Sequence, residues 1–207
     1  MSLRLEFLLV IGALALVVSS PAQELPVPDP EVVHPNIRVS VPNLSPENAA
    51  DESSGAVAQA AMATVLSASN MTCDSASQLN AVLEANGGTT LRTLAEKLRG
   101  ASCMTNGTIV HLSAEFTPNA SIQPDSILAP ILHGRPLLLR WNGELYVLRG
   151  VIYDEHLHNS GNRENVIREL LLIDPRYSDR RRFVSFDRQK NDFSEVEGIA
   201  EIRFVLP

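Results

Sequence analysis

The chain has 207 residues, a formal net charge of −7, and two cysteines. An acidic chain repels a phosphate backbone, so this charge argues against nucleic acid as a partner. Two cysteines without histidines at ligand spacing do not support a zinc site, and we expect neither a metal nor a cofactor.

The chain starts with the features of a secretory signal peptide. Arg4 supplies the positive charge, the segment from Phe7 to Val18 is almost entirely apolar, and Ser20-Pro21-Ala22 offers small residues for cleavage. The apolar run has about 12 residues, whereas a membrane span needs roughly 20. We predict a signal peptide over 1–22 and a secreted or periplasmic mature chain without a stable membrane span. A retained N-terminal anchor is the alternative.

Residues 23–36 are rich in proline and are predicted to form a linker or an extended arm. The folded domain is expected over 37–207, starting with a short strand over 37–41. Export favours a disulfide between Cys73 and Cys103, with two buried free thiols as the alternative.

Helical patterns occupy the next part of the chain. A small-residue helix over about 53–68 opens on Ser53 and Ser54, because a serine hydroxyl can accept a bond from a free N–H of the first turn. Further helices are expected over about Ser75–Glu84, from a Thr89 or Thr90 cap up to Gly100, and over 123–132. A strand over 107–113 lies between the last two.

Strand patterns fill the C-terminal part. We predict strands over 137–141 and 144–153, joined by Asn142-Gly143, which is a strong hairpin signal. A polar loop with His156 and His158 is expected over 154–165, and a solvated loop is a simpler interpretation of these histidines than a metal site. Further strands are expected over 166–173, 182–186 and 198–206. Helices followed by an antiparallel sheet indicate an α+β protein.

Several short motifs occur in an order that matches a known family. They are Gly55-Ala56-Val57-Ala58-Gln59, Gly87-Gly88-Thr89-Thr90-Leu91, Gly134-Arg135-Pro136-Leu137-Leu138, the Gly143–Gly150 segment and Leu172-Ile173-Asp174-Pro175. In this order and spacing, residues 37–206 resemble the small bacterial papain-like cysteine peptidases. The resemblance implies a papain-like fold, with an N-terminal helical half whose central helix packs on a C-terminal antiparallel sheet.

The resemblance also indicates where the catalytic residues of the family would lie. The cysteine position falls on Ser53, with Ser54 as the neighbouring register, the histidine position on Glu144, and the acidic position on Asp174. The oxyanion glutamine falls near Glu47 or Asn48. A cysteine peptidase needs a thiolate, an imidazole and oxyanion donors, so the resemblance implies the fold and argues against the activity.

Three functions follow from these patterns. The first is an exported, non-catalytic protein that binds a peptide or a cell-envelope partner through a remnant cleft. The second is an active hydrolase with non-standard catalytic residues, and the third is an interaction protein of unrelated α+β fold. Arg176 and the run Arg180-Arg181-Arg182 form either a solvated turn or a basic patch that could dock an acidic partner.

Overall fold

The computed structural model describes residues 31–71, 90–105, 107–185 and 193–205. The predicted signal peptide, the predicted helix over Ser75–Glu84 and Cys73 therefore lie outside the described residues. None of the helices in the described part is long and apolar enough to cross a membrane.

One strand and two helices begin the described part of the chain, and consecutive strands fill its C-terminal part. In order, the described elements are β1 (Glu31–Ser40), α1 (Ser54–Ser67), α3 (Leu91–Leu98), β2 (Ser102–Thr105), β3 (Thr108–Pro118), the short 3₁₀ helix η1 (Asn119–Ser121), α4 (Pro124–Leu132), β4 (Leu137–Trp141), β5 (Glu144–Leu157), β6 (Arg163–Asp174), β7 (Tyr177–Ser185) and β8 (Val196–Val205).

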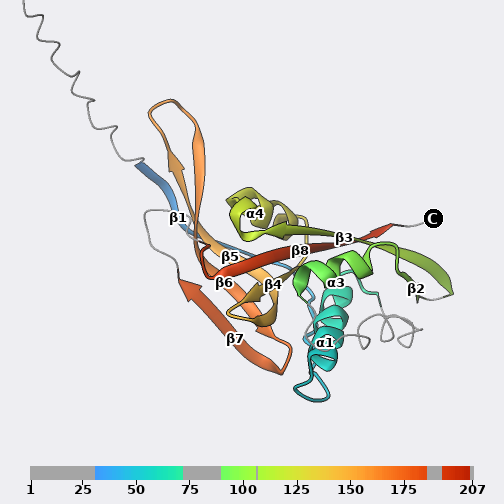
Figure 1. Cartoon of the computed structure of the whole chain (residues 1–207). Helices are drawn as coiled ribbons and strands as arrows, with labels where there is room; N and C mark the ends of the chain where they lie inside the picture. Colours follow the sequence, from blue (N-terminus) through green and yellow to red (C-terminus); the bar gives the residue numbers. More distant parts are fainter. Residues whose placement is uncertain (1–30, 72–89, 106, 186–192, 206–207) are drawn as a thin grey trace, which may run out of the picture.

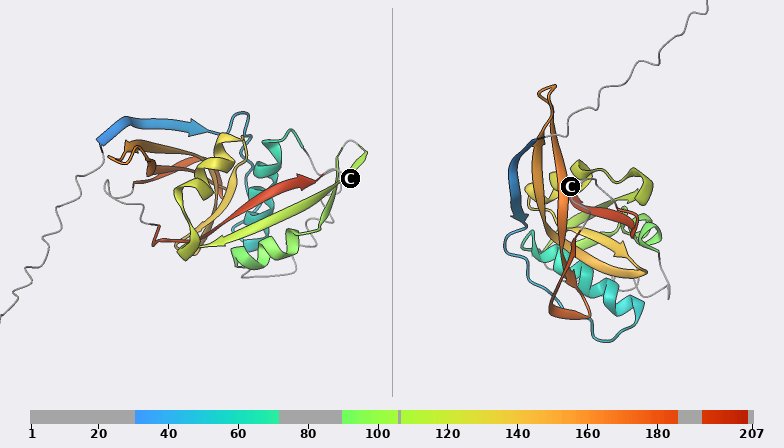
Figure 2. Two further views of the ribbon diagram at one scale, coloured as in Figure 1. Left: turned by 90° about the horizontal axis from the view of Figure 1, so that it is seen from above. Right: turned by 90° about the vertical axis from the view of Figure 1, so that its left-hand side faces the viewer.

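Eight strands form one antiparallel sheet in the order β2-β3-β8-β4-β5-β6-β7, and β1 pairs with the second half of β5. Because β5 and β6 are longer than their neighbours, their hairpin projects from the body of the molecule with β1 beside it (Figures 1 and 2). The α+β class is thus confirmed.

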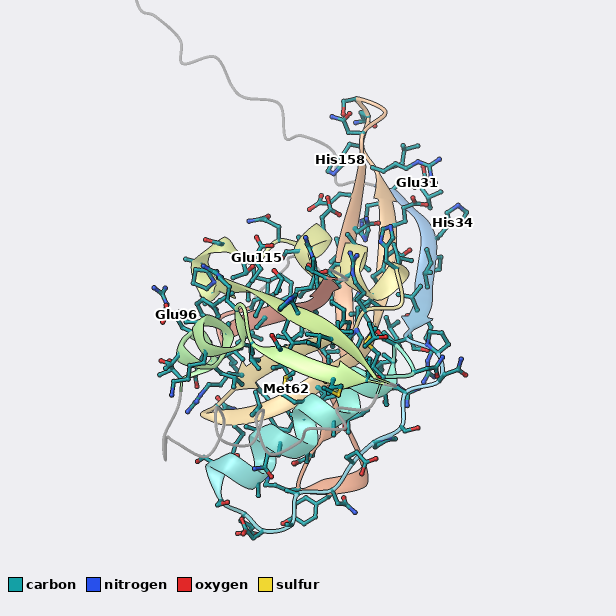
Figure 3. All side chains as sticks on the ribbon, turned by 90° about the vertical axis from the view of Figure 1, so that its right-hand side faces the viewer. Glu31, His34, Met62, Glu96, Glu115 and His158 are labelled. Carbon is teal, nitrogen blue, oxygen red and sulfur yellow. The ribbon has the colours of Figure 1, made fainter. Side chains whose placement is uncertain are left out.

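Helices cover both faces of the sheet (Figure 1). Helices α1 and α3 bury one face, where Met62 of α1 lies against the sheet (Figure 3). Helix α4 buries the other face through Ile127, Leu128 and Ile131. Alternate residues of each strand point to opposite faces, so the sheet supplies both cores.

Small residues explain how closely α1 approaches the sheet. Ala61 is fully buried and Ala58 almost so, and both join the core that contains Leu138 and Val147. The hydroxyl of Ser53 caps the helix by accepting a hydrogen bond from the Ala56 N–H at 3.3 Å. The predicted helix over 53–68 is confirmed to within one residue at each end.

The β4–β5 hairpin also follows the prediction. Asn142 and Gly143 both have positive φ angles, 50° and 78°, which a two-residue turn between twisted antiparallel strands requires. Strand β4 covers the predicted residues 137–141.

The polar loop expected over 154–165 is wrong. Residues 154–157 continue β5 and 163–165 begin β6, so only residues 158–162 form the hairpin loop. The carboxylate of Asp154 is satisfied within the sheet, because it accepts hydrogen bonds from the Asn36 N–H at 2.7 Å and from Arg168 at 2.6 Å.

The strand expected over 37–41 starts earlier, at Glu31, because residues 31–37 pair with 153–157 of the long β5 strand. The strand expected over 107–113 is one arm of a β2–β3 hairpin. Strands β1, β2 and β3 all belong to the same sheet as the C-terminal strands. The described residues therefore do not divide into a helical half and a β half.

Candidate functional site

Ser53, where the resemblance would place the family cysteine, lies at the N-terminus of α1. Ser53 is exposed, and its backbone N–H donates to the carboxylate of Asp51 at 2.8 Å while its hydroxyl caps the helix. Hydrogen bonds from Ser53 hold the pKa of Asp51 below its usual value. Both polar groups of Ser53 are therefore engaged in local structure at the start of the helix.

Asp174 ends β6 and is fully buried. Its carboxylate accepts three hydrogen bonds from Arg176: from the backbone N–H at 3.1 Å, from Nε at 2.9 Å and from Nη2 at 3.0 Å. The two side-chain bonds form the bidentate geometry that a guanidinium makes with a carboxylate. A buried carboxylate is thus fully paired within one turn of the chain.

Glu144 begins β5 and joins the same arginine. Its Oε2 accepts a hydrogen bond from Arg176 Nη1 at 2.5 Å, and its side chain is 48% exposed. We call Glu144, Asp174 and Arg176 the carboxylate cluster. The structure therefore brings together two of the three sequence-predicted positions, and an arginine lies between them.

The electrostatics of the carboxylate cluster are those of a closed ion-pair network. The hydrogen bonds and charge of Asp174, with the charge of Glu144, raise the pKa of Arg176 above its already high value. The arginine therefore stays protonated. Both carboxylates make charge-assisted hydrogen bonds to this cation.

Ser53 is not a member of the carboxylate cluster. Side chains two residues apart on a strand point to the same face, so Glu144 lies on the face of Tyr146 and Asp174 on the face of Leu172. This face carries α4, whereas α1 packs on the opposite face. No hydrogen bond or ion pair among the described residues joins Ser53 to either carboxylate.

The backbone nevertheless places the two regions side by side. The N–H of Ala49, in the segment before α1, donates to the carbonyl of Pro175 at 2.7 Å, directly after Asp174. Figures 1 and 2 show this segment beside the β6–β7 turn. The candidate site thus consists of the carboxylate cluster and, next to it, the entry to α1.

The positions considered for the oxyanion glutamine lie in the same entry segment. Glu47 and Asn48 are both exposed. The N–H of Glu47 donates to Thr64 Oγ1 at 2.9 Å, which ties the segment to the buried side of α1. This contact has a structural role, and the described contacts of Glu47 aim no donor at Ser53.

The cysteines do not supply a nucleophile in the described residues. Cys103 is buried on β2, no free cysteine is found in the described part of the chain, and Cys73 lies outside it. The Cys73–Cys103 disulfide stays a prediction.

The histidines are dispersed over the sheet. His111 on β3 is exposed and its Nδ1 is 2.9 Å from Ser102 Oγ. His156 is buried on β5, and His158, near the tip of the β5–β6 hairpin, contacts Glu164 at 2.7 Å (Figure 3). Within the described ranges, no three His, Cys, Asp or Glu side chains are arranged to hold a metal ion.

Sequence reasoning missed the role of Arg176. The sequence groups it with Arg180-Arg181-Arg182 in a solvated turn or basic patch, but its side chain is only 18% exposed and is paired with two acids. The spacing Asp174-Pro175-Arg176 is the available signal, since an aspartate in a turn accepts a hydrogen bond from the backbone N–H two residues on, which brings Arg176 next to it. The side chains of 180–182 lie outside the described set.

Among the pockets lined by described residues, two lie away from the carboxylate cluster and Ser53. One, of about 240 Å³, lies between α4 and strands β3 and β8, and the other, of about 360 Å³, lies between the C-terminal end of α1 and β8. Arg135 and Arg203 line both, and Ser53, Glu144 and Asp174 line neither. Comparison with protein-family models, curated proteins and solved structures finds no match for this chain.

Proposed function

We propose that this chain is an exported, non-catalytic protein of papain-like fold that binds a peptide or a cell-envelope partner. The observation that carries the proposal is the pairing of Arg176 with both carboxylates. The positions where the resemblance expects an imidazole and its acidic partner hold two carboxylates that share one guanidinium instead.

The α1 N-terminus supports the same proposal. A serine hydroxyl is a weak nucleophile unless a base removes its proton. The hydroxyl of Ser53 accepts a capping hydrogen bond, and the described residues bring no histidine to it. Among the described residues, the site therefore has no imidazole beside the hydroxyl of Ser53, which supports a binding role over acyl transfer.

The hydrolase alternative has one specific observation in its favour, the Ser102–His111 hydrogen bond. This pair joins two strands on an exposed part of the sheet, and no described hydrogen bond or ion pair brings a carboxylate to His111. An imidazole without an orienting acid or an oxyanion hole is a poor activator of serine.

The test is hydrolysis of fluorogenic peptide substrates by the chain that starts at residue 23. We expect no turnover above the buffer blank, and no change in Ser53→Ala or Ser102→Ala. Turnover that one of these variants abolishes would overturn the proposal and assign the nucleophile. The Ser53→Cys, Glu144→His double variant tests the fold, since gained cleavage would support a papain-like placement of both positions.

Export is tested separately. Mass spectrometry of the protein secreted by its host should give an N-terminus close to residue 23. Protein that keeps residues 1–22 would replace the proposed export with the anchored alternative.

A further inference from the structure

The C-terminal end of β8 has an open edge. Its pairing with β3 continues to Val205, opposite His111, but its pairing with β4 begins at Glu201, opposite Leu137. Residues 202–205 therefore have a strand on one side only among the described residues. We call this stretch the β8 edge.

The direction of the backbone groups at the β8 edge follows from the neighbouring strand. The Leu112 N–H donates to Ala101 and its carbonyl accepts from Gly100, both at 2.8 Å, so Leu112 turns its groups away from β8. Residues opposite each other in an antiparallel ladder either exchange both bonds or point both away. Phe204, opposite Leu112, therefore directs its N–H and carbonyl to the open side, as does Ile202 two residues earlier.

Proline explains why β4 does not cover the β8 edge. The register that pairs Leu137 with Glu201 would place Pro136 opposite Ile202, and proline has no N–H to donate. Outside the sheet ladders, no backbone hydrogen bond among the described residues reaches Ile202 or Phe204. Unpaired groups of this kind are a template for another extended chain.

A pocket of about 360 Å³ lies along this edge. Val65, Ser69 and Met71 of α1 and the segment after it form one wall, and Ile202 and Phe204 form another. Arg135 and Arg203 also line the pocket. Both form an ion pair with Glu201, at 2.8 Å and 2.7 Å, and Arg203 also lies 3.7 Å from Glu115. The remaining lining is mostly apolar, which favours an apolar side chain over a charged one.

We propose that an extended peptide binds as an added strand along the β8 edge, with an apolar side chain in this pocket. Peptide residues opposite Ile202 and Phe204 would point their side chains to the same face of the sheet, where the pocket lies. The C-terminal end of α1 lies over one face of the β8 edge, and Pro136 lies at the end of the pocket. This leaves room for a single extended chain more readily than for the edge strand of a second folded copy. The site is separate from the carboxylate cluster and does not depend on whether that cluster is inactive.

The test uses labelled peptides Gly-Thr-Val-Xaa-Val-Thr-Gly in which Xaa is Leu, Phe, Asp or Gly. Fluorescence anisotropy should show binding of the Leu or Phe peptide and weaker binding of the Asp and Gly peptides. Amide exchange followed by NMR should slow at Ile202 and Phe204 on binding. The Arg203 amide should change little, because it already pairs with β3.

A matched pair of variants separates backbone pairing from side-chain contact. Phe204→Pro and Phe204→Ala both remove the ring, but only the first removes the N–H at the open edge, so it should bind about tenfold more weakly than the second. Filling the pocket with Ser69→Phe should also weaken binding, whereas Ser121→Phe, at an exposed site near α4, should not.

Three outcomes would overturn the proposal. The first is that no peptide binds, and the second is that the two Phe204 variants bind equally well. The third is that amide protection of Ile202 and Phe204 rises with protein concentration while light scattering gives a doubled mass. The last outcome would assign the β8 edge to a second copy of the chain.

Discussion

Replacing Arg176 by methionine is expected to destabilise the protein strongly. Asp174 is fully buried and receives two of its three hydrogen bonds from the Arg176 side chain. The variant keeps the backbone N–H bond but leaves a buried carboxylate without its cation. Removing one partner of a buried ion pair costs about 3–5 kcal/mol of unfolding free energy.

The exposed arm of the carboxylate cluster gives the matched control. Glu144 is 48% exposed, so Glu144→Gln should cost no more than about 1 kcal/mol. The double variant Asp174→Leu, Arg176→Met should be more stable than Arg176→Met alone, because it removes the buried charge together with its partner.

Urea unfolding followed by circular dichroism measures these differences directly. In a thermal scan, a loss of about 3–5 kcal/mol corresponds to a midpoint lowered by roughly 6–20 °C for a domain of this size. An Arg176→Met variant that loses less than about 1 kcal/mol would refute the reasoning, because Asp174 would then not depend on its cation.

Three further predictions concern other parts of the molecule. Burial would raise the pKa of Asp154, but the hydrogen bonds from the Asn36 N–H and Arg168, with the charge of Arg168, hold it below the usual aspartate value. Asp154→Asn should therefore lower the unfolding free energy by roughly 3 kcal/mol at pH 7. In urea titrations, the difference between variant and wild type should shrink as the pH falls below about 3.9, and a difference that stays constant would contradict this. A Cβ at Gly150 would lie 2.4 Å from the Val39 carbonyl oxygen. Gly150→Val should therefore lower the unfolding free energy by roughly 1–3 kcal/mol and speed amide exchange at Val39. Unchanged exchange would show that the pairing of β1 does not depend on the close contact at Gly150. Cys73→Ser with Cys103→Ser should lower the unfolding free energy by about 3 kcal/mol if the predicted disulfide forms; two titratable thiols in the denatured, unreduced wild type would exclude it.

Capping and turn residues correctly predicted the helices and the hairpin that begin or end at them. Ser53 caps α1, Thr90 caps α3 through the Thr93 N–H, and Asn142-Gly143 turns β4 into β5, each as the residue type favours. These positions depend on the conformation of a few adjacent residues, so the sequence alone contains the information.

Long-range pairing could not be predicted in the same way. The segment over 154–157 is polar and read as a loop, but Asp154 is buried because Arg168 lies across the β5–β6 ladder and Asn36 comes from β1. Which polar groups will meet depends on strand register, and strand register follows from the whole sheet.

The candidate site shows the same limit. The resemblance selected Glu144 and Asp174, and the structure does bring them together, but the group between them is Arg176. Motif order along the chain suggested these two positions, whereas their hydrogen-bond partner is a neighbour that the motif does not include. The β8 edge could not be predicted from the sequence either. It arises because Pro136 lies opposite Ile202, and this register is defined only by the folded sheet.

The most direct test of the non-catalytic account is cleavage of a pooled peptide library by the purified chain from residue 23 onward, analysed by mass spectrometry. The account predicts the same peptides, at the same abundance, with and without the protein after prolonged incubation at neutral pH. New peptide termini that appear with the wild-type chain and are absent with Ser53→Ala would contradict it.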